Sequence, residues 1–308
     1  GHPVNGSISF AYGQKASHTS GDNASQPIAT FFLVVLRFLG EGWLLLSAGF
    51  IWISHFAGKY GLPRVTWFPV ERAKNFAALG WLAVQVIMWF LYASELPQNL
   101  PTKWLLSGQF DLLLQIPFAV VLLAQIFLFA LLLIPNMVDG WYLGLWVLLT
   151  ASFAFSGHTW STKELMFSLI ARLLHLGSGA LWLGGIAYLL CIGIKHQTKY
   201  LEILRQFRSF FSKTALIASV LLIISGLLLV GIQTDWVAVW TFQTFWSRFL
   251  LIKMFLVLGM FLYAFLQTYQ WKNLGTLETD SLRTEWILGL LALLFGIWMS
   301  QIAYPILP

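Results

Sequence analysis

The chain has little sulfur and little charge. Its 308 residues include one cysteine, Cys191, which excludes an intrachain disulfide and a cluster of thiolate ligands, so any soft-metal chemistry would rest on His and Met. Charged residues make up only 10% of the chain and hydrophobic residues 58%, and the mean hydropathy is +0.77. These values exclude an ordinary soluble domain and predict a protein that crosses a membrane many times.

Eight apolar stretches follow residue 28, each near the roughly 20 residues that cross the hydrocarbon of a bilayer. They cover about 29–54, 75–96, 109–134, 140–156, 165–194, 213–233, 248–270 and 284–304. We therefore expect an all-α fold, a polytopic membrane helix bundle with about eight transmembrane helices. Pro117 falls inside the third stretch and is expected to kink that helix.

The first residues differ from the rest of the chain. Ile8, Phe10 and Tyr12 alternate with polar or small residues, so 1–12 reads as the last strand of a β-domain that precedes the chain. Residues 13–28 are polar and predict a flexible linker. The membrane domain is then expected over 29–305.

Lysine and arginine are distributed unevenly between alternate loops. The loops after the first, third, fifth and seventh stretches hold eleven (Lys59, Arg64, Arg72, Lys74, Lys195, Lys199, Arg205, Arg208, Lys213, Lys272 and Arg283), and the opposite side holds four (Lys15, Lys103, Lys163 and Arg248). By the positive-inside rule, both termini are predicted to lie outside a cytoplasmic membrane. The excess of Lys and Arg is then explained by the orientation of the chain in a lipid bilayer, which is its expected partner. We expect no nucleic-acid partner.

Five charged or histidine residues lie inside the apolar stretches and away from their ends: Arg37, Glu41, Arg172, His175 and Lys253. Each costs roughly 2.5 to 3.5 kcal/mol to place at the centre of a membrane helix, so such residues usually face the bundle interior and mark a functional site. In the predicted orientation they fall at one level in the outer half of the membrane, with Glu41 near the middle. The sequence predicts a polar pocket that opens outward.

Some of these residues also have a purely structural interpretation. Arg37 and Glu41 are spaced i,i+4 and can pair to fix helix packing, and Lys253 can extend its side chain to the outer surface. A neutral imidazole at His175 needs a partner, which favours a role as ligand or proton carrier. Met166 and Met254 map to the same outer half, where thioether sulfur suits Cu(I), although Met also fills helix cores.

Several motifs resemble the copper resistance protein D (CopD) family. The run from Arg172 to Gly185 (RLLHLGSGALWLGG) resembles its signature, and the likeness extends through Ser156-Gly157-His158, the run WSRFLLIK that ends at Lys253, and the run LRTE that ends at Glu285. Order and spacing agree over most of 30–304. Gln267 departs from the pattern, because asparagine is more usual there. The first twelve residues similarly resemble the final strand of a copper-binding CopC β-barrel, as in YcnJ-like copper import proteins in which the two domains are fused.

The resemblance implies copper transport across the cytoplasmic membrane, most plainly uptake, with copper as the ion and a CopC-like domain of the same parent chain as partner. His158 at the mouth of the pocket and His175 within it are the first candidate ligands, and Met166 and Met254 are softer relays. His2 matches a Cu(II) ligand of the CopC barrel.

The remaining residues of the signature receive structural roles. Arg172 and Lys253 are expected to pair with Glu41 or to hold helix positions. Trp182, Gly184 and Gly185 are expected to serve helix packing.

Two other functions stay open. Two intramembrane histidines are the minimum for bis-imidazole haem ligation, which would require His158 and His175 on facing helices. A copper-delivery or assembly subunit that does not itself transport is the second. No Walker loop, aspartyl-phosphate motif or nucleophile elbow occurs in the sequence, so we expect no enzyme, and any transport would be passive or coupled to a gradient or partner.

Overall fold

All secondary structure in the described part of the chain is helical. The computed structural model describes residues 26–65, 71–94, 99–155, 164–195, 200–274 and 279–302. The predicted β-strand at 1–12 and most of the predicted linker lie outside these residues. Helix α1 begins at Gln26, so the last three residues of the predicted linker are helical.

The helices follow one another with short connections. They are α1 (Gln26–Arg37), the π-helical turn η1 (Phe38–Gly42), α2 (Trp43–Lys59), α3 (Glu71–Ser94), α4 (Leu100–Leu106), α5 (Phe110–Leu113), α6 (Pro117–Leu132), α7 (Asp139–Ser152), the 3-10 turn η3 (Phe153–Phe155), α8 (Leu165–Lys195), α9 (Tyr200–Gln233), α10 (Trp236–Trp240), α11 (Phe245–Leu274) and α12 (Thr279–Met299).

Six helical segments in the described residues are long and apolar enough to cross a membrane. They are Phe31–Lys59, Phe76–Ser94, Leu165–Ile192, Phe210–Gln233, Phe245–Gln270 and Thr279–Met299. Helix α6 is apolar but has 16 residues, and α7 has 14, so both are shorter than the roughly 20 residues that span the hydrocarbon at right angles. The part of the chain that the structure describes is thus all-helical, and its six such helices indicate a membrane protein.

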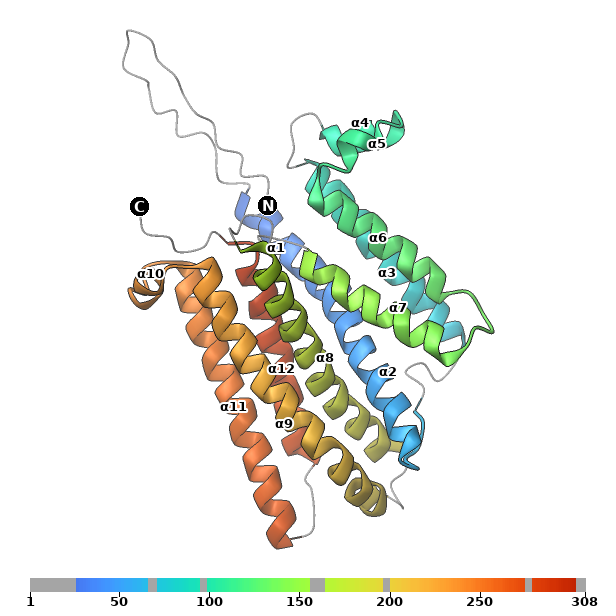
Figure 1. Cartoon of the computed structure of the whole chain (residues 1–308), viewed down its shortest axis with the longest axis vertical. Helices are drawn as coiled ribbons and strands as arrows, with labels where there is room; N and C mark the ends of the chain where they lie inside the picture. The colour runs from blue at the N-terminus through green and yellow to red at the C-terminus, as the bar shows by residue number, and fades with distance from the viewer. Residues whose placement is uncertain are drawn as a thin grey trace.

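Pro117 ends one helix and starts another, which corrects the expectation of a single kinked helix over 109–134. Helix α5 ends at Leu113, Ile116 is extended with φ −98° and ψ 103°, and α6 begins at Pro117. Proline has no N–H to donate and disfavours a helical residue before it, whereas the first position of a helix tolerates it well. The short α4 and α5 lie beside this break, at the same end of the bundle as the start of α1 (Figure 1).

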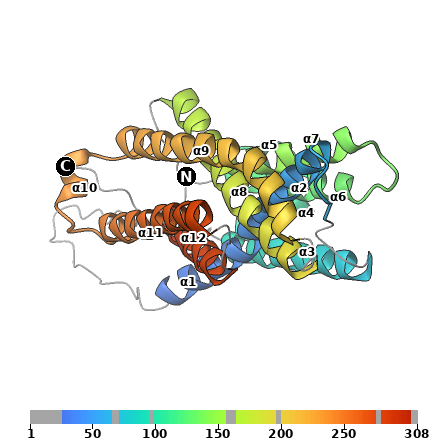
Figure 2. The same ribbon diagram turned by 90° about the horizontal axis from the view of Figure 1, so that it is seen from below.

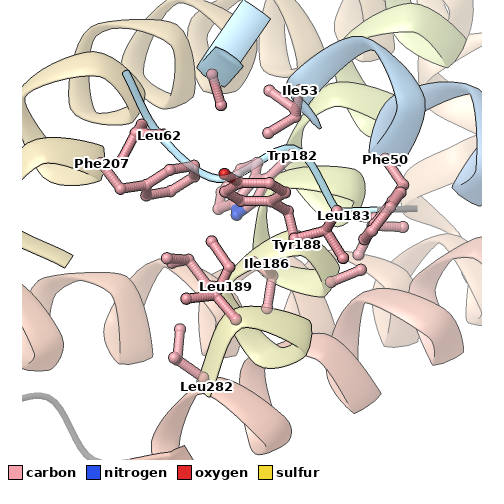
Figure 3. Packing of buried hydrophobic residues seen from close by; sticks show 14 of the residues in the cluster. Phe50, Ile53, Leu62, Trp182, Leu183, Ile186, Tyr188, Leu189, Phe207 and Leu282 are labelled. Carbon is pink, nitrogen blue, oxygen red and sulfur yellow. The ribbon is translucent and has the colours of Figure 1, made fainter. Parts of the chain in front are cut away.

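Helix α8 lies at the centre of the bundle, where it packs against α2, α9 and α12. Its approach to α2 is backbone to backbone: a Cβ added at Gly184 would lie 2.2 Å from the Gly49 carbonyl carbon, and one added at Gly49 would lie 1.8 Å from the Ala180 carbonyl oxygen. Only glycine allows two helices to come this close. Figure 3 shows the core beside this contact, where Phe50 and Tyr188 lie near Trp182.

The remaining helices form two groups around α8. Helices α11 and α12 lie side by side, and α3, α6 and α7 gather near α2 (Figures 1 and 2). The start of α1 and the end of α12 lie at the same end of the bundle (Figure 1). Polar side chains that are distant in the sequence therefore meet at this end.

Candidate functional site

Arg37 and Glu41 form a buried ion pair where α1 passes into the π-helical turn. Arg37 Nε donates to Glu41 Oε1 at 2.7 Å and Arg37 Nη2 donates to Oε2 at 3.1 Å, so the contact is bidentate. Both residues are buried, with 3% and 9% of their surface exposed. A planar guanidinium with two parallel bonds is the strong form of an arginine–carboxylate contact.

The end of α12 completes the surroundings of this pair. Arg37 Nη1 donates to Ser300 Oγ at 2.9 Å, and the next residue, Gln301, donates from Nε2 to the Tyr92 hydroxyl at 3.4 Å. Ser300 lies directly after α12 and Tyr92 lies on α3. Three segments distant in sequence are thereby connected at one end of the bundle.

Arg172, His175 and Lys253 form a second cluster of basic groups on α8 and α11. The charges of Arg172 and Lys253 lie close enough to act on the His175 ring and on each other. Lys253 Nζ lies 3.0 Å from the position that a Cβ on Gly296 would occupy. Gly296 is one helical turn before Ser300, to which Arg37 donates. The Lys253 amine and the Arg37 guanidinium therefore approach the same last part of α12.

Lys253 does not pair with Glu41, as the sequence suggested it could. Within the described residues, the carboxylate of Glu41 is bonded to Arg37, and Lys253 makes no ion pair. The hydrophobic stem of Lys253 lies in the bundle and its amine faces Gly296 and His175.

The His175 ring is held by α9. Its Nδ1 lies 3.1 Å from the Leu222 carbonyl oxygen and 3.2 Å from Ser225 Oγ. The carbonyl can only accept, so Nδ1 carries the proton in the neutral ring and Nε2 keeps its lone pair. Gly226 gives the ring room, because a Cβ there would lie 3.3 Å from the His175 Cε1. A backbone carbonyl that fixes one ring nitrogen is the usual support for a histidine whose other nitrogen binds a metal.

The two candidate methionines lie on the outside of the bundle. Met166 is 67% exposed and Met254 is 46% exposed, whereas Met88 and Met299 are buried at 3% and 7%. The structure therefore does not bring the sulfur atoms of Met166 and Met254 to His175. Helices that are apolar on every side give no sequence signal for which side faces lipid.

Two of the predicted ligands, His158 and His2, lie outside the described residues. Within the ranges that the structure does describe, no three His, Cys, Asp or Glu side chains come together as a metal site. Among the candidate ligands that the structure describes, His175 is half-buried and has a ring oriented by α9.

The three signature residues expected in helix packing lie where α8 meets α2, α9 and α11. Gly184 meets Gly49 of α2, and a Cβ added at Gly185 would lie 2.1 Å from the Phe211 ring of α9. Trp182 is 3% exposed and its ring packs against Phe261 in an edge contact with centroids 5.1 Å apart. These close contacts occur within one chain.

Glu285 is the buried polar group that sequence reasoning missed. It is 3% exposed on α12, where Trp182 Nε1 donates to Oε1 at 2.9 Å and Gln267 Nε2 donates to Oε2 at 2.9 Å. The sequence placed Glu285 only at the end of the LRTE run and gave it no role. The sequence does contain a signal for a buried polar site, because Gln267 and Glu285 fall inside two otherwise apolar stretches.

In comparisons with known proteins, no family model, no curated protein and no solved structure matches the chain. The likeness to the CopD family accordingly rests on the motifs of the sequence.

Proposed function

We propose that the chain carries copper across the cytoplasmic membrane, in the direction of uptake, with His175 as a ligand on the path. The observation that supports this proposal is the fixed imidazole: the Leu222 carbonyl holds Nδ1, which leaves the Nε2 lone pair for a metal. The resemblance of the surrounding run to the CopD signature supplies copper as the ion. The charged groups inside the bundle favour a transport path there, because charged groups in hydrocarbon are retained chiefly at functional sites.

The proposed topology has eight crossings, with α6 and α7 as a short pair that completes the six longer helices. An even number of crossings is supported by the start of α1 and the end of α12 at one end of the bundle (Figure 1). The excess of Lys and Arg in the loops at the other end supports an extracytoplasmic location for both termini. His175 then lies in the outer half of the membrane, where an incoming ion arrives first.

The positive charge beside His175 affects which copper species can bind to its ring. Lys253, whose amine makes no ion pair within the described residues, disfavours a bare cation at Nε2 and favours a ligand that carries negative charge. We propose that copper reaches His175 with at least one anionic ligand, such as chloride or a thiolate. The Arg37 and Glu41 pair is internally neutral, and the bond from Arg37 to Ser300 connects α1 to the end of α12.

Copper flux into vesicles tests this function. The purified chain would be reconstituted in proteoliposomes that contain a copper-sensitive dye, and His175→Ala would be compared with His55→Ala. His55 is a matched control because it lies on α2 with its ring 3.8 Å from the Asp139 carboxylate, away from the proposed path. We expect His175→Ala to lose copper entry and His55→Ala to retain it.

Two outcomes would contradict the proposal. Equal flux with and without His175 would remove this residue from the path. Copper that binds to the chain but never reaches the vesicle lumen would indicate a delivery subunit instead. A Soret band in the purified protein would favour the haem alternative.

A further inference from the structure

The carboxyl group of Glu285 lies inside the membrane with neutral partners only. Trp182 from α8 and Gln267 from α11 each donate to one of its oxygens at 2.9 Å, and no cation in the described part of the chain pairs with it. A buried carboxylate without a cation is costly, so the neutral acid competes with the ionised form. The group is therefore built to change its protonation.

On the neighbouring elements, the charged side chains near the other end of α12 that the structure describes lie away from Glu285. Helix α12 packs against α1, η1, α8 and α11. Arg37 of α1 and Glu41 of η1 pair near Ser300, about 22 Å along α12 by helical rise, and Lys253 of α11 lies near Gly296, about 16 Å away. Arg172 and His175 of α8 belong to that same outer cluster. On α12 itself, Asp280 and Arg283 pair with each other at 3.1 Å in an exposed position.

Gln267 can serve both protonation states, which an arginine or lysine could not. Its amide carries a donor nitrogen and an acceptor oxygen. With ionised Glu285 the amide N–H donates to Oε2, and when Oε2 takes up a proton the amide can turn by half a rotation so that its oxygen accepts the new O–H. Trp182 donates to Oε1 in both states.

A second amide extends the polar path toward the end of the bundle where α11 ends and α12 begins. Gln270 lies three residues after Gln267 on α11, and its Oε1 is buried without a hydrogen-bond partner among the described side chains. Residues three apart share a helix face, so a water molecule at Gln270 would lie on the way to Gln267. In the proposed orientation this is the cytoplasmic end.

We propose that Glu285 is a proton-binding site inside the bundle, which exchanges its proton through Gln267 with the end of the bundle where α12 begins. In this step an O–H bond of a hydronium ion breaks, its proton forms an O–H bond on Oε2 of the carboxylate, and a water molecule is left; release reverses the step, and no oxidation or reduction occurs. The site goes beyond copper binding, because it lies on the opposite side of Trp182 from His175 and needs no metal.

Infrared difference spectroscopy on the purified chain, without copper, tests the proposal. We expect a carboxylic-acid C=O stretch that changes with pH and shifts in heavy water. This band is expected to be absent from Glu285→Gln, which is isosteric, and to remain in the matched variant Glu41→Gln. A wild-type spectrum whose carboxylic-acid bands all persist in Glu285→Gln would overturn the proposal.

Gln267→Leu provides a second readout that keeps Glu285 in place. Leucine offers no acceptor to the O–H, so the C=O band is expected to move to higher wavenumber, as a carboxylic acid does when it loses a hydrogen bond. An unchanged band position would contradict the role of the amide. Because neither spectrum involves copper, these results stand or fall separately from copper transport.

Discussion

Glu41 and Glu285 are both buried glutamates in membrane helices, yet their surroundings differ in charge. Glu41 receives two bonds from the Arg37 guanidinium, whereas Glu285 receives one bond each from the neutral groups of Trp182 and Gln267. An arginine keeps its charge at any physiological pH, so Glu41 lies against a fixed positive charge. The comparison shows that burial alone does not assign a role, because the partner decides whether a carboxylate is a fixed structural charge or an exchangeable proton site.

The largest expected effect is a difference in the free energy of unfolding between variants of the two glutamates. Glu41→Gln leaves the buried Arg37 without a counter-charge, and we expect a loss of about 3 kcal/mol in the free energy of unfolding. Glu285→Gln keeps both hydrogen-bond partners and removes a costly charge, so its loss is expected to stay below ~1 kcal/mol. Unfolding of both variants in mixed micelles, followed by circular dichroism, measures the difference.

A double variant distinguishes charge from side-chain volume. Replacing both residues of the outer pair, Arg37→Met with Glu41→Leu, should recover most of the stability that Glu41→Gln loses, because no uncompensated charge remains. If Glu41→Gln and Glu285→Gln were equally stable, the contrast between the two sites would be wrong.

A smaller effect is expected at the indole that donates to Glu285. Trp182→Phe keeps the ring packed against Phe261 but removes the N–H donor, which should cost about 1 to 2 kcal/mol. Trp286→Phe is the matched control, because its Nε1 is buried without a hydrogen-bond partner in the described structure. The same unfolding experiment applies, and equal losses for both substitutions would show that the bond from Trp182 adds no stability.

Local features of the site could be predicted from the sequence, and contacts between distant helices could not. The spacing of Arg37 and Glu41 is enough to predict their pairing, because residues four apart meet on one helix face. The Glu285 site combines three helices, and no spacing within one of them reveals it. The exposure of Met166 and Met254 was equally hidden, because α8 and α11 are apolar all round.

The same distinction holds for the fold, where features within one helix could be predicted and contacts between helices could not. Length and apolar composition predict the membrane helices, whose backbone bonds must be satisfied internally. The break at Pro117 was anticipated only as a kink, because whether a proline bends a helix or starts a new one depends on the residues that pack beside it. The close approach of Gly49 and Gly184 likewise required both helices to be placed in space.

X-ray absorption spectroscopy of the copper-loaded chain tests most directly whether His175 binds the ion. We expect imidazole scattering around copper in the wild type and in His55→Ala, and its loss in His175→Ala. The same imidazole signal in His175→Ala as in the wild type would contradict a copper path through this residue.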